Sequence, residues 1–235
     1  MSLTARSALV IGTGGLGGPA LYTLASAGVG RIVLMDADAI ETSNLNRQPF
    51  FREADLGARK ATVAAERLRA LVPGARIEPL DERFDARNAA ALLRSVDVVV
   101  DGSDNFATKF LANDTAVSVG KPLVHGGILR TTAQLLTVVP GPAGCLRCLF
   151  EDPPPHDSMP SNADAGVLGA LAGFAGALMA AEAIRLLSGE RGAYVGRLLA
   201  FEASSARSRL VMVRRREGCA ACGARPGPAG SGEGP

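Results

Sequence analysis

A glycine-rich segment close to the N-terminus is the feature that most constrains what this chain can fold into. Residues 12–17 read Gly-Thr-Gly-Gly-Leu-Gly and lie between an apolar run at residues 8–11 and a helical pattern at residues 16–27. Glycines in this context permit a tight turn and let a phosphate approach backbone N–H groups, where the helix N-terminus adds partial positive charge. The segment therefore predicts a nucleotide site, which we assign to Gly12, Gly14, Gly15 and Gly17.

Asp36 strengthens this prediction. It ends the next apolar run, 19 residues after Gly17, where a carboxylate can accept hydrogen bonds from two ribose hydroxyls. Two alternatives stay open at this point. One is a glycine-rich turn that only lets a helix pack on a strand, and the other is an NAD site, because dehydrogenases use the same fingerprint.

Short apolar runs alternate with longer helical patterns through the first half of the chain. This alternation predicts βαβ units and a Rossmann-like α/β fold, with a mostly parallel sheet and helices on both faces. From residue 132 the pattern changes to extended segments, which predict an antiparallel C-terminal extension. The expected strands cover residues 8–11, 31–35, 75–80, 96–101, 122–124, 133–139, 198–202 and 208–214, and the expected helices cover 16–27, 58–71, 86–93 and 105–119.

The composition is that of a globular protein, with 47% hydrophobic and 20% charged residues in a chain of 235. A net charge of +2 and the scarcity of aromatic side chains argue against a DNA-binding protein. The apolar stretch at residues 165–181 predicts a buried helix, with a membrane span as the weaker interpretation. No signal peptide precedes the first expected strand, so we expect a cytoplasmic protein. Residues 224–235 are mostly Gly, Pro, Ala and Ser and are expected to be disordered.

The four cysteines form two Cys-x-x-Cys pairs, Cys145 with Cys148 and Cys219 with Cys222. Four thiolates in two such pairs make a closed, tetrahedral zinc site that has no open position for catalysis. Disulfides are disfavoured in a cytoplasmic protein, and a redox motif would need only one pair. The sequence therefore predicts a structural Zn²⁺ that holds the C-terminal hairpin to the loop after the sheet.

Four further segments make the nucleotide prediction specific. They are residues 36–38 (Asp-Ala-Asp), 43–48 (Ser-Asn-Leu-Asn-Arg-Gln), 57–61 (Gly-Ala-Arg-Lys-Ala) and 98–105 (Val-Val-Val-Asp-Gly-Ser-Asp-Asn). With the glycine-rich segment and the cysteine pairs, this series resembles the ThiF/MoeB family of ATP-dependent adenylyltransferases of ubiquitin-like sulfur carriers. That family is related to the adenylation domains of ubiquitin-activating enzymes. The resemblance spans nearly the whole chain, and it implies one adenylation domain over residues 1–223 that binds ATP and not NAD.

The resemblance also implies site residues, and their chemistry agrees with it. Adenylyl transfer needs positive charge around the α-phosphate, which Arg47 and Lys60 can supply. Asp104 follows an apolar strand and is the candidate ligand for Mg²⁺. Taken alone, each of these residues would be a surface charge or, for Asp104, a helix N-cap. The resemblance adds Asp38, Ser43, Asn44 and Asn105 to the nucleotide site.

The sequence departs from the family pattern in two places. Relatives that form a thioester or persulfide usually carry a cysteine three residues before an Ala-Gly-Val segment, and this chain has Asn162 there. With all four cysteines assigned to zinc, we expect the chemistry to stop at the acyl-adenylate. Relatives also have an N-terminal segment whose arginine reaches the ATP site of the dimer partner. Only 11 residues precede Gly12, so we expect that arginine to be missing unless Arg6 or another residue replaces it.

The function implied by the resemblance is that of a homodimeric enzyme. It would use Mg-ATP to adenylate the C-terminal Gly-Gly carboxylate of a ubiquitin-like sulfur carrier, for sulfur transfer in cofactor or thiolated tRNA biosynthesis. The sulfur would come from a donor such as a cysteine desulfurase or a rhodanese. Two alternatives stay open: an enzyme that resembles the tRNA threonylcarbamoyladenosine dehydratases or modifies peptides, and a catalytically impaired nucleotide-binding protein. His125 fits a hydrogen-bonded core histidine, and we assign it no role.

Overall fold

Eight strands form one mixed sheet in the order β3-β2-β1-β4-β5-β6-β7-β8. The five strands from β3 to β5 run parallel, whereas β6, β7 and β8 continue the sheet as antiparallel neighbours. The computed structural model describes residues 2–141, 143–154 and 166–223. The strands are β1 (Ser7–Ile11), β2 (Arg31–Met35), β3 (Arg76–Leu80), β4 (Val98–Asp101), β5 (Leu123–Leu129), β6 (Thr132–Val138), β7 (Arg197–Glu202) and β8 (Arg207–Met212).

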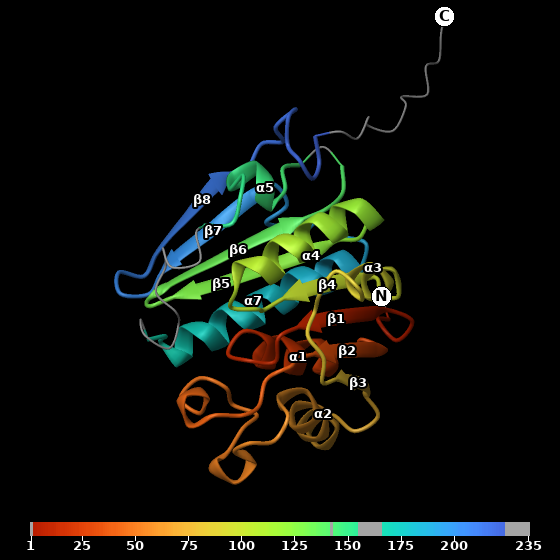
Figure 1. Cartoon of the computed structure of the whole chain (residues 1–235), viewed down its shortest axis with the longest axis vertical. Coiled ribbons are helices and arrows are strands. Elements are labelled where there is room, and N and C mark those ends of the chain that lie inside the picture. Colours follow the sequence, from red (N-terminus) through yellow and green to blue (C-terminus); the bar gives the residue numbers. More distant parts are fainter. Residues whose placement is uncertain (1, 142, 155–165, 224–235) are drawn as a thin grey trace, which may run out of the picture.

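Helices cover both faces of the sheet. Figure 1 shows α4 (Phe106–Val119) crossing one face and α7 (Gly169–Leu187) crossing the other. Alternate residues of β1 enter two separate cores, because side chains along a strand point to opposite faces. The α7 layer also holds α1 (Gly17–Ser26) and α2 (Lys60–Leu71), and the α4 layer holds α3 (Ala89–Arg94) and the short α5 (Leu146–Leu149).

The strand order reverses between β1 and β4, and this is where an open α/β sheet binds ligands. The turn after β1 packs tightly against the start of α1. A side chain at Gly17 would place its Cβ 1.8 Å from the carbonyl oxygen of Gly12, so only glycine fits. The predicted α/β fold with an antiparallel C-terminal extension is confirmed.

Several predicted boundaries were wrong, most of all for β5. This strand has seven residues instead of the expected three, because Gly126 and Gly127 continue it. Glycine disfavours strands in general, but a Cβ at Gly126 would lie 2.1 Å from Sδ of Met179 on α7. The close packing of α7 against β5 therefore requires glycine at position 126. Because glycine is rare in strands, the sequence analysis ended this strand too early. The short helix α5 was not predicted.

The expected helix at 165–181 is displaced, since α7 begins at Gly169 and ends at Leu187. It continues through Glu182, whose side chain is buried and fully hydrogen-bonded. That carboxylate accepts bonds from the Thr137 hydroxyl at 2.9 Å and from the N–H groups of Ala193 and Tyr194 at 2.9 and 3.1 Å. Residues 165 and 224–235, which carried predictions, lie outside the described residues.

Helix α7 is long and apolar enough to cross a membrane, and it is the only such helix among the described residues. Half of its most apolar window is buried inside the protein. Its inner side packs against α1 and against strands β4, β5 and β6. This packing supports the interpretation of α7 as a core helix.

Candidate functional site

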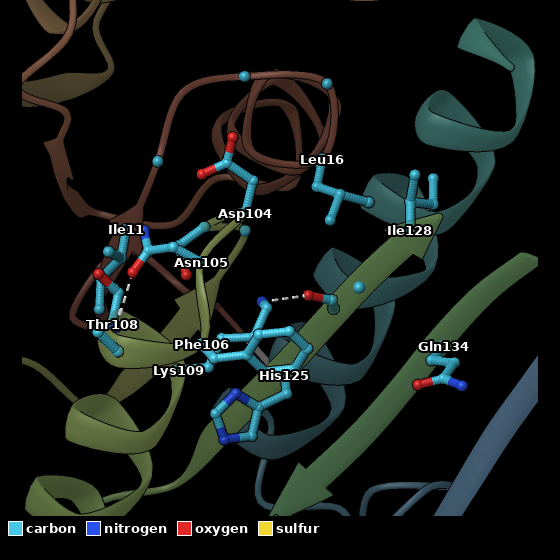
Figure 2. A pocket seen from close by; sticks show the side chains of 18 of the residues that line it. Ile11, Leu16, Asp104, Asn105, Phe106, Thr108, Lys109, His125, Ile128 and Gln134 are labelled. Atoms are coloured by element: carbon cyan, nitrogen blue, oxygen red, sulfur yellow. Dashed lines mark hydrogen bonds between the residues drawn. The ribbon is translucent and has the colours of Figure 1, made fainter. Parts of the chain in front are cut away.

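A cavity of about 1450 Å³ opens at the carboxyl ends of β1, β4 and β5. Most of the residues predicted for the nucleotide site line it. Figure 2 shows Asp104 and Leu16 at one side of this cavity, with Lys109, Phe106 and His125 on the neighbouring wall. The predicted residues in its lining are Gly12, Gly14, Gly15, Asp36, Asp38, Arg47, Lys60, Asp104 and Asn105.

Two cations stand beside the glycine-rich turn. Arg47 packs close to Gly15, and its guanidinium is held by the Ser43 carbonyl oxygen at 2.7 Å. Lys60 opens α2, and its nearly buried ammonium donates to an Asp38 carboxylate oxygen at 2.9 Å. The cavity wall therefore offers one fork-shaped and one point-like positive charge to phosphate oxygens.

Asp36 lies at the end of β2, as predicted. Its Oδ2 accepts bonds from the N–H and the hydroxyl of Thr13 at 2.8 and 2.9 Å. These bonds fix the carboxylate against the glycine-rich turn and leave it in the cavity lining, where the prediction places the ribose. Thr13, which sequence reasoning did not single out, orients this acid.

Asp104 is exposed in the turn between β4 and α4. The neighbouring Asn105 caps α4, since its side-chain oxygen accepts the Thr108 N–H at 2.9 Å. Because Asn105 caps α4, the Asp104 carboxylate is not used as the cap and can serve as a cation ligand. Carboxylate oxygen is the donor that Mg²⁺ prefers, so this residue fits the predicted ion.

Three predicted residues do not line the cavity: Gly17, Ser43 and Asn44. Gly17 serves the packing of the turn, as described above. Asn44 is buried, and its side chain accepts the Glu41 N–H at 3.1 Å, which stabilises the 3₁₀ turn η1 (Thr42–Asn44). Ser43 contributes its backbone carbonyl to Arg47. Asn44 and Ser43 therefore shape the segment that presents Arg47.

Sequence reasoning missed other residues of the cavity wall. Gln48 is buried there beneath Gly14, and its Oε1 has no hydrogen-bond partner among the described residues. Lys109, four residues after Asn105 on α4, also lines the cavity together with His125 of β5. Lys109 follows Asn105 by four residues, which places both residues on the same side of the helix. This spacing could have identified Lys109 from the sequence.

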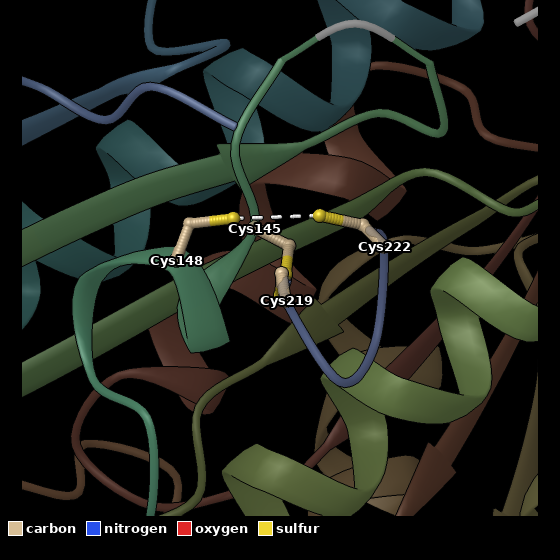
Figure 3. Close-up of side chains that lie close together, drawn as sticks. All are labelled: Cys145, Cys148, Cys219 and Cys222. Atoms are coloured by element: carbon tan, nitrogen blue, oxygen red, sulfur yellow. Dashed lines mark hydrogen bonds between the residues drawn. The ribbon is translucent and has the colours of Figure 1, made fainter. Parts of the chain in front are cut away.

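The four cysteines meet in one cluster, as predicted. All four Sγ atoms lie within 4.8 Å of one another. Figure 3 shows Cys145 and Cys148 approaching Cys219 and Cys222 from two separate segments. The Cys145–Cys219 and Cys148–Cys222 sulfur distances are 3.7 and 3.4 Å, and a tetrahedral zinc with bonds of about 2.3 Å would hold its sulfurs about 3.8 Å apart.

N–H groups surround these sulfurs. The Asn113 amide points to Cys145 Sγ at 3.7 Å, and the Arg216 N–H points to Cys148 Sγ at 3.4 Å. In the metal-free cluster, burial raises the pKa of Cys145 and Cys222. Burial also opposes ionisation of Cys219, but backbone N–H groups of Cys222 and Ala221 lower its pKa to about 7. Such donors stabilise thiolates, which is the form that binds a metal. The cluster fits a four-thiolate zinc site.

Comparison with known proteins agrees with this geometry. The model of the ThiF family matches residues 2–221. The chain belongs to the ThiF family. The resemblance inferred from the sequence motifs is therefore confirmed.

Several relatives are similar over most of this ThiF-family chain. It is 45% identical to a Thermus thermophilus sulfur carrier protein adenylyltransferase over 229 residues, covering 95% of this chain and 84% of the relative. It is 43% identical to the Haloferax volcanii SAMP-activating enzyme E1, covering 94% and 82%. The Bos taurus adenylyltransferase and sulfurtransferase MOCS3 is 43% identical, but this chain spans 50% of its length.

Among solved structures, E. coli MccB with ATP superposes with a TM-score of 0.82. The match covers 94% of this chain and 68% of MccB, at 22% sequence identity. At that identity the similarity establishes the shared fold.

Proposed function

We propose that this chain is an ATP-dependent adenylyltransferase that activates the C-terminal Gly-Gly carboxylate of a ubiquitin-like sulfur carrier. The observation that carries the proposal is the convergence of Arg47, Lys60 and Asp104 on one cavity beside the glycine-rich turn. The names of the similar relatives support the same class of reaction. They favour it over the alternative that resembles a tRNA threonylcarbamoyladenosine dehydratase.

In the proposed reaction a carboxylate oxygen of the carrier attacks the α-phosphorus of ATP. The bond from that phosphorus to the oxygen bridging the α- and β-phosphates breaks, and pyrophosphate leaves with its electron pair. The attacking group is already ionised at neutral pH, so the enzyme needs no general base. Negative charge grows on the phosphate oxygens, where Arg47 and Lys60 would stabilise it. Lys60 would exchange its Asp38 partner for phosphate oxygen.

Asp104 would hold Mg²⁺, which neutralises charge on the leaving pyrophosphate. The adenosine ribose would bind Asp36, whose orientation is set by Thr13. The acyl-adenylate is a reactive mixed anhydride, so the cavity must shield it from water until a sulfur donor arrives. The cysteine cluster would hold Zn²⁺ as a structural ion.

The assay for this function is exchange of labelled pyrophosphate into ATP. We expect exchange that depends on a carrier ending in Gly-Gly and stops when those two glycines are deleted. Exchange that needs an RNA or an unrelated peptide would favour another family reaction. ATP binding without exchange would support an impaired nucleotide-binding protein.

We also propose that the enzyme works as a cytoplasmic homodimer, with neither DNA nor a membrane as its partner. An exposed apolar surface supports the dimer: Phe174 of α7 packs its ring 5.0 Å from that of Phe201, and Leu210 and Met212 of β8 are exposed on the same face. Arg6 lies at the beginning of β1, at the end of the strand away from the glycine-rich turn. It therefore lies away from the site of its own chain, and any role of Arg6 would be in the ATP site of the partner subunit. A cysteine desulfurase or a rhodanese would supply the sulfur.

We predict that the carrier is never joined covalently to this enzyme. All four cysteines gather in one cluster, and Asn162, outside the described residues, occupies the position where relatives keep a reactive cysteine. Incubation with carrier and Mg-ATP should therefore give no reductant-sensitive band at the summed mass on a gel. Such a band would mean that a cluster cysteine is catalytic.

A further inference from the structure

The buried side chains of Asp101 and His125 form a cluster with the half-buried Lys109, close to the candidate magnesium ligand Asp104. Asp101 and His125 are register partners on the parallel strands β4 and β5, so their side chains lie next to each other on one face. The Asp101 Oδ2 atom is 2.8 Å from His125 Nδ1 and 3.3 Å from Lys109 Nζ. Neither the acid nor the imidazole has a place in the reaction proposed above.

The charges of this cluster are defined by its surroundings. Burial alone would raise the pKa of Asp101, but the Lys109 charge and the hydrogen bonds from His125 and Ser103 hold it well below its usual value. Burial lowers the pKa of His125 despite the nearby carboxylate, so its imidazole is neutral at pH 7. A neutral imidazole that faces a carboxylate donates through Nδ1. Its Nε2 is buried without a partner, so among the described residues Asp101 is the only hydrogen-bond partner of this ring.

Asp101 joins two parts of the cavity wall. Its Oδ1 accepts the N–H and the hydroxyl of Ser103 at 3.0 and 2.6 Å, which fixes the turn that carries Asp104. Its Oδ2 holds the Lys109 ammonium, which also donates to the Gly126 carbonyl oxygen at 2.6 Å (Figure 2). An ammonium has three N–H donors, and the described residues offer acceptors to two of them. Lys109 is therefore a fixed cation with a donor to spare on the cavity wall.

The floor of the cavity next to Lys109 suits an extended peptide without side chains. Gly127 of β5 has open space where a Cβ would stand, within 4 Å of which no atom lies. Gln134 of β6 is its partner across the two strands, and both residues line the cavity. The Lys109 ammonium bonds the carbonyl oxygen of Gly126, so a chain end laid over the neighbouring Gly127 would pass beside that ammonium.

We propose that Lys109 binds the C-terminal carboxylate end of the carrier, and that Asp101 and His125 are positioning residues that hold Lys109 in place. This inference rests on the proposed function. It adds the residue that would orient the attacking carboxylate. A charged N–H to carboxylate bond at a fixed point would bring that oxygen into line with the α-phosphorus.

The test measures carrier-dependent pyrophosphate exchange, with a recombinant ubiquitin-like sulfur carrier ending in Gly-Gly from the same organism. Lys109→Gln keeps a donor but removes the charge, and we expect kcat/KM for the carrier to fall roughly 10- to 100-fold. The Kd for Mg-ATP should stay unchanged. Affinity for the carrier that lacks its two glycines should also stay unchanged, since Lys109 would touch only the tail.

Two variants of His125 test the positioning role. His125→Leu removes the bond to Asp101, and we expect carrier-dependent exchange to fall about tenfold or more. His125→Asn can donate to Asp101 from nearly the same point as Nδ1, so it should restore exchange to within a few-fold of the wild type. A purely structural histidine would instead change the melting temperature and leave the kinetics of the folded fraction intact.

Lys121→Ala is the matched control. Lys121 follows the end of the same helix and makes the same kind of bond, from its ammonium to the Val96 carbonyl oxygen at 2.6 Å, at the opposite edge of the sheet. The Lys121→Ala variant should show the same carrier-dependent pyrophosphate exchange as the wild type. Wild-type kinetics in Lys109→Gln or His125→Leu, or an equal loss of ATP affinity, would overturn the inference while the proposed function stood. If Lys109→Gln does not fold, the two His125 variants decide. Absence of exchange in the wild type with Gly-Gly carriers would overturn the proposed function and this inference with it.

Discussion

Replacing Asp104 with asparagine should abolish carrier-dependent pyrophosphate exchange, with a loss on the order of 100-fold or more. The substitution keeps the shape of the side chain and removes the negative charge that would hold Mg²⁺. We expect the fold to survive, because the neighbouring Asn105 caps α4 and its bond to the Thr108 N–H is untouched. Exchange kinetics and thermal melting, measured on the same preparation, separate the two effects.

Glu66→Gln provides the control for this variant. Glu66 is an exposed carboxylate on α2 that does not line the cavity. The Glu66→Gln variant loses the same negative charge outside the site, so its pyrophosphate exchange rate should equal that of the wild type. Full activity in Asp104→Asn at saturating Mg²⁺ would place the metal elsewhere. A similar loss in both variants would point to a general effect of charge.

The sequence was sufficient to predict the parallel core of this fold. Strands β1, β2 and β4 are short and mainly apolar, β3 mixes charged and apolar residues, and all four alternate with helical patterns. A glycine-rich turn marks the switch point. Strand β5 was underestimated because the glycines that allow α7 to pack closely also look like a strand end. Helix α7 was displaced because Glu182 reads as a surface residue, and only its tertiary hydrogen bonds reveal why it is buried.

The candidate site was predictable where residues follow strand ends. Asp36 and Asp104 come directly after or soon after strands, so the sheet edge brings them together. Asn44 is predicted as a nucleotide ligand, and the structure shows that its side chain also accepts the Glu41 N–H in the turn before Arg47, a bond that the sequence alone does not reveal. The link between Asp101 and His125 depends on the register of β4 against β5. The local sequence of either strand does not predict this register.

Substituting serine for one of the four cysteines should have the largest effect on stability. The cluster joins the segment that holds Cys145 and Cys148 to the loop of Cys219 and Cys222, near the C-terminal end of the described chain. Binding of zinc to a structural site contributes folding free energy directly, because the unfolded chain lacks that site. A serine in place of a thiolate removes one of four ligands and leaves the other sulfurs as thiols that do not bond one another.

We expect purified protein to contain about one zinc per chain. Cys145→Ser and Cys222→Ser should each lose the metal and melt roughly 10 °C or more below the wild type, which corresponds to about 3 kcal/mol or more for a chain of this size. Ala220→Ser is the matched control, since it places the same hydroxyl at an exposed position between Cys219 and Cys222. It should keep the zinc and the melting temperature. Prolonged treatment with a chelator should reproduce the cysteine variants in the wild type, because both remove the same ion. The assignment would be contradicted by purified protein that contains no zinc, has four titratable thiols and keeps the same melting temperature when Zn²⁺ is added. Those thiols would then be candidate nucleophiles for the adenylate.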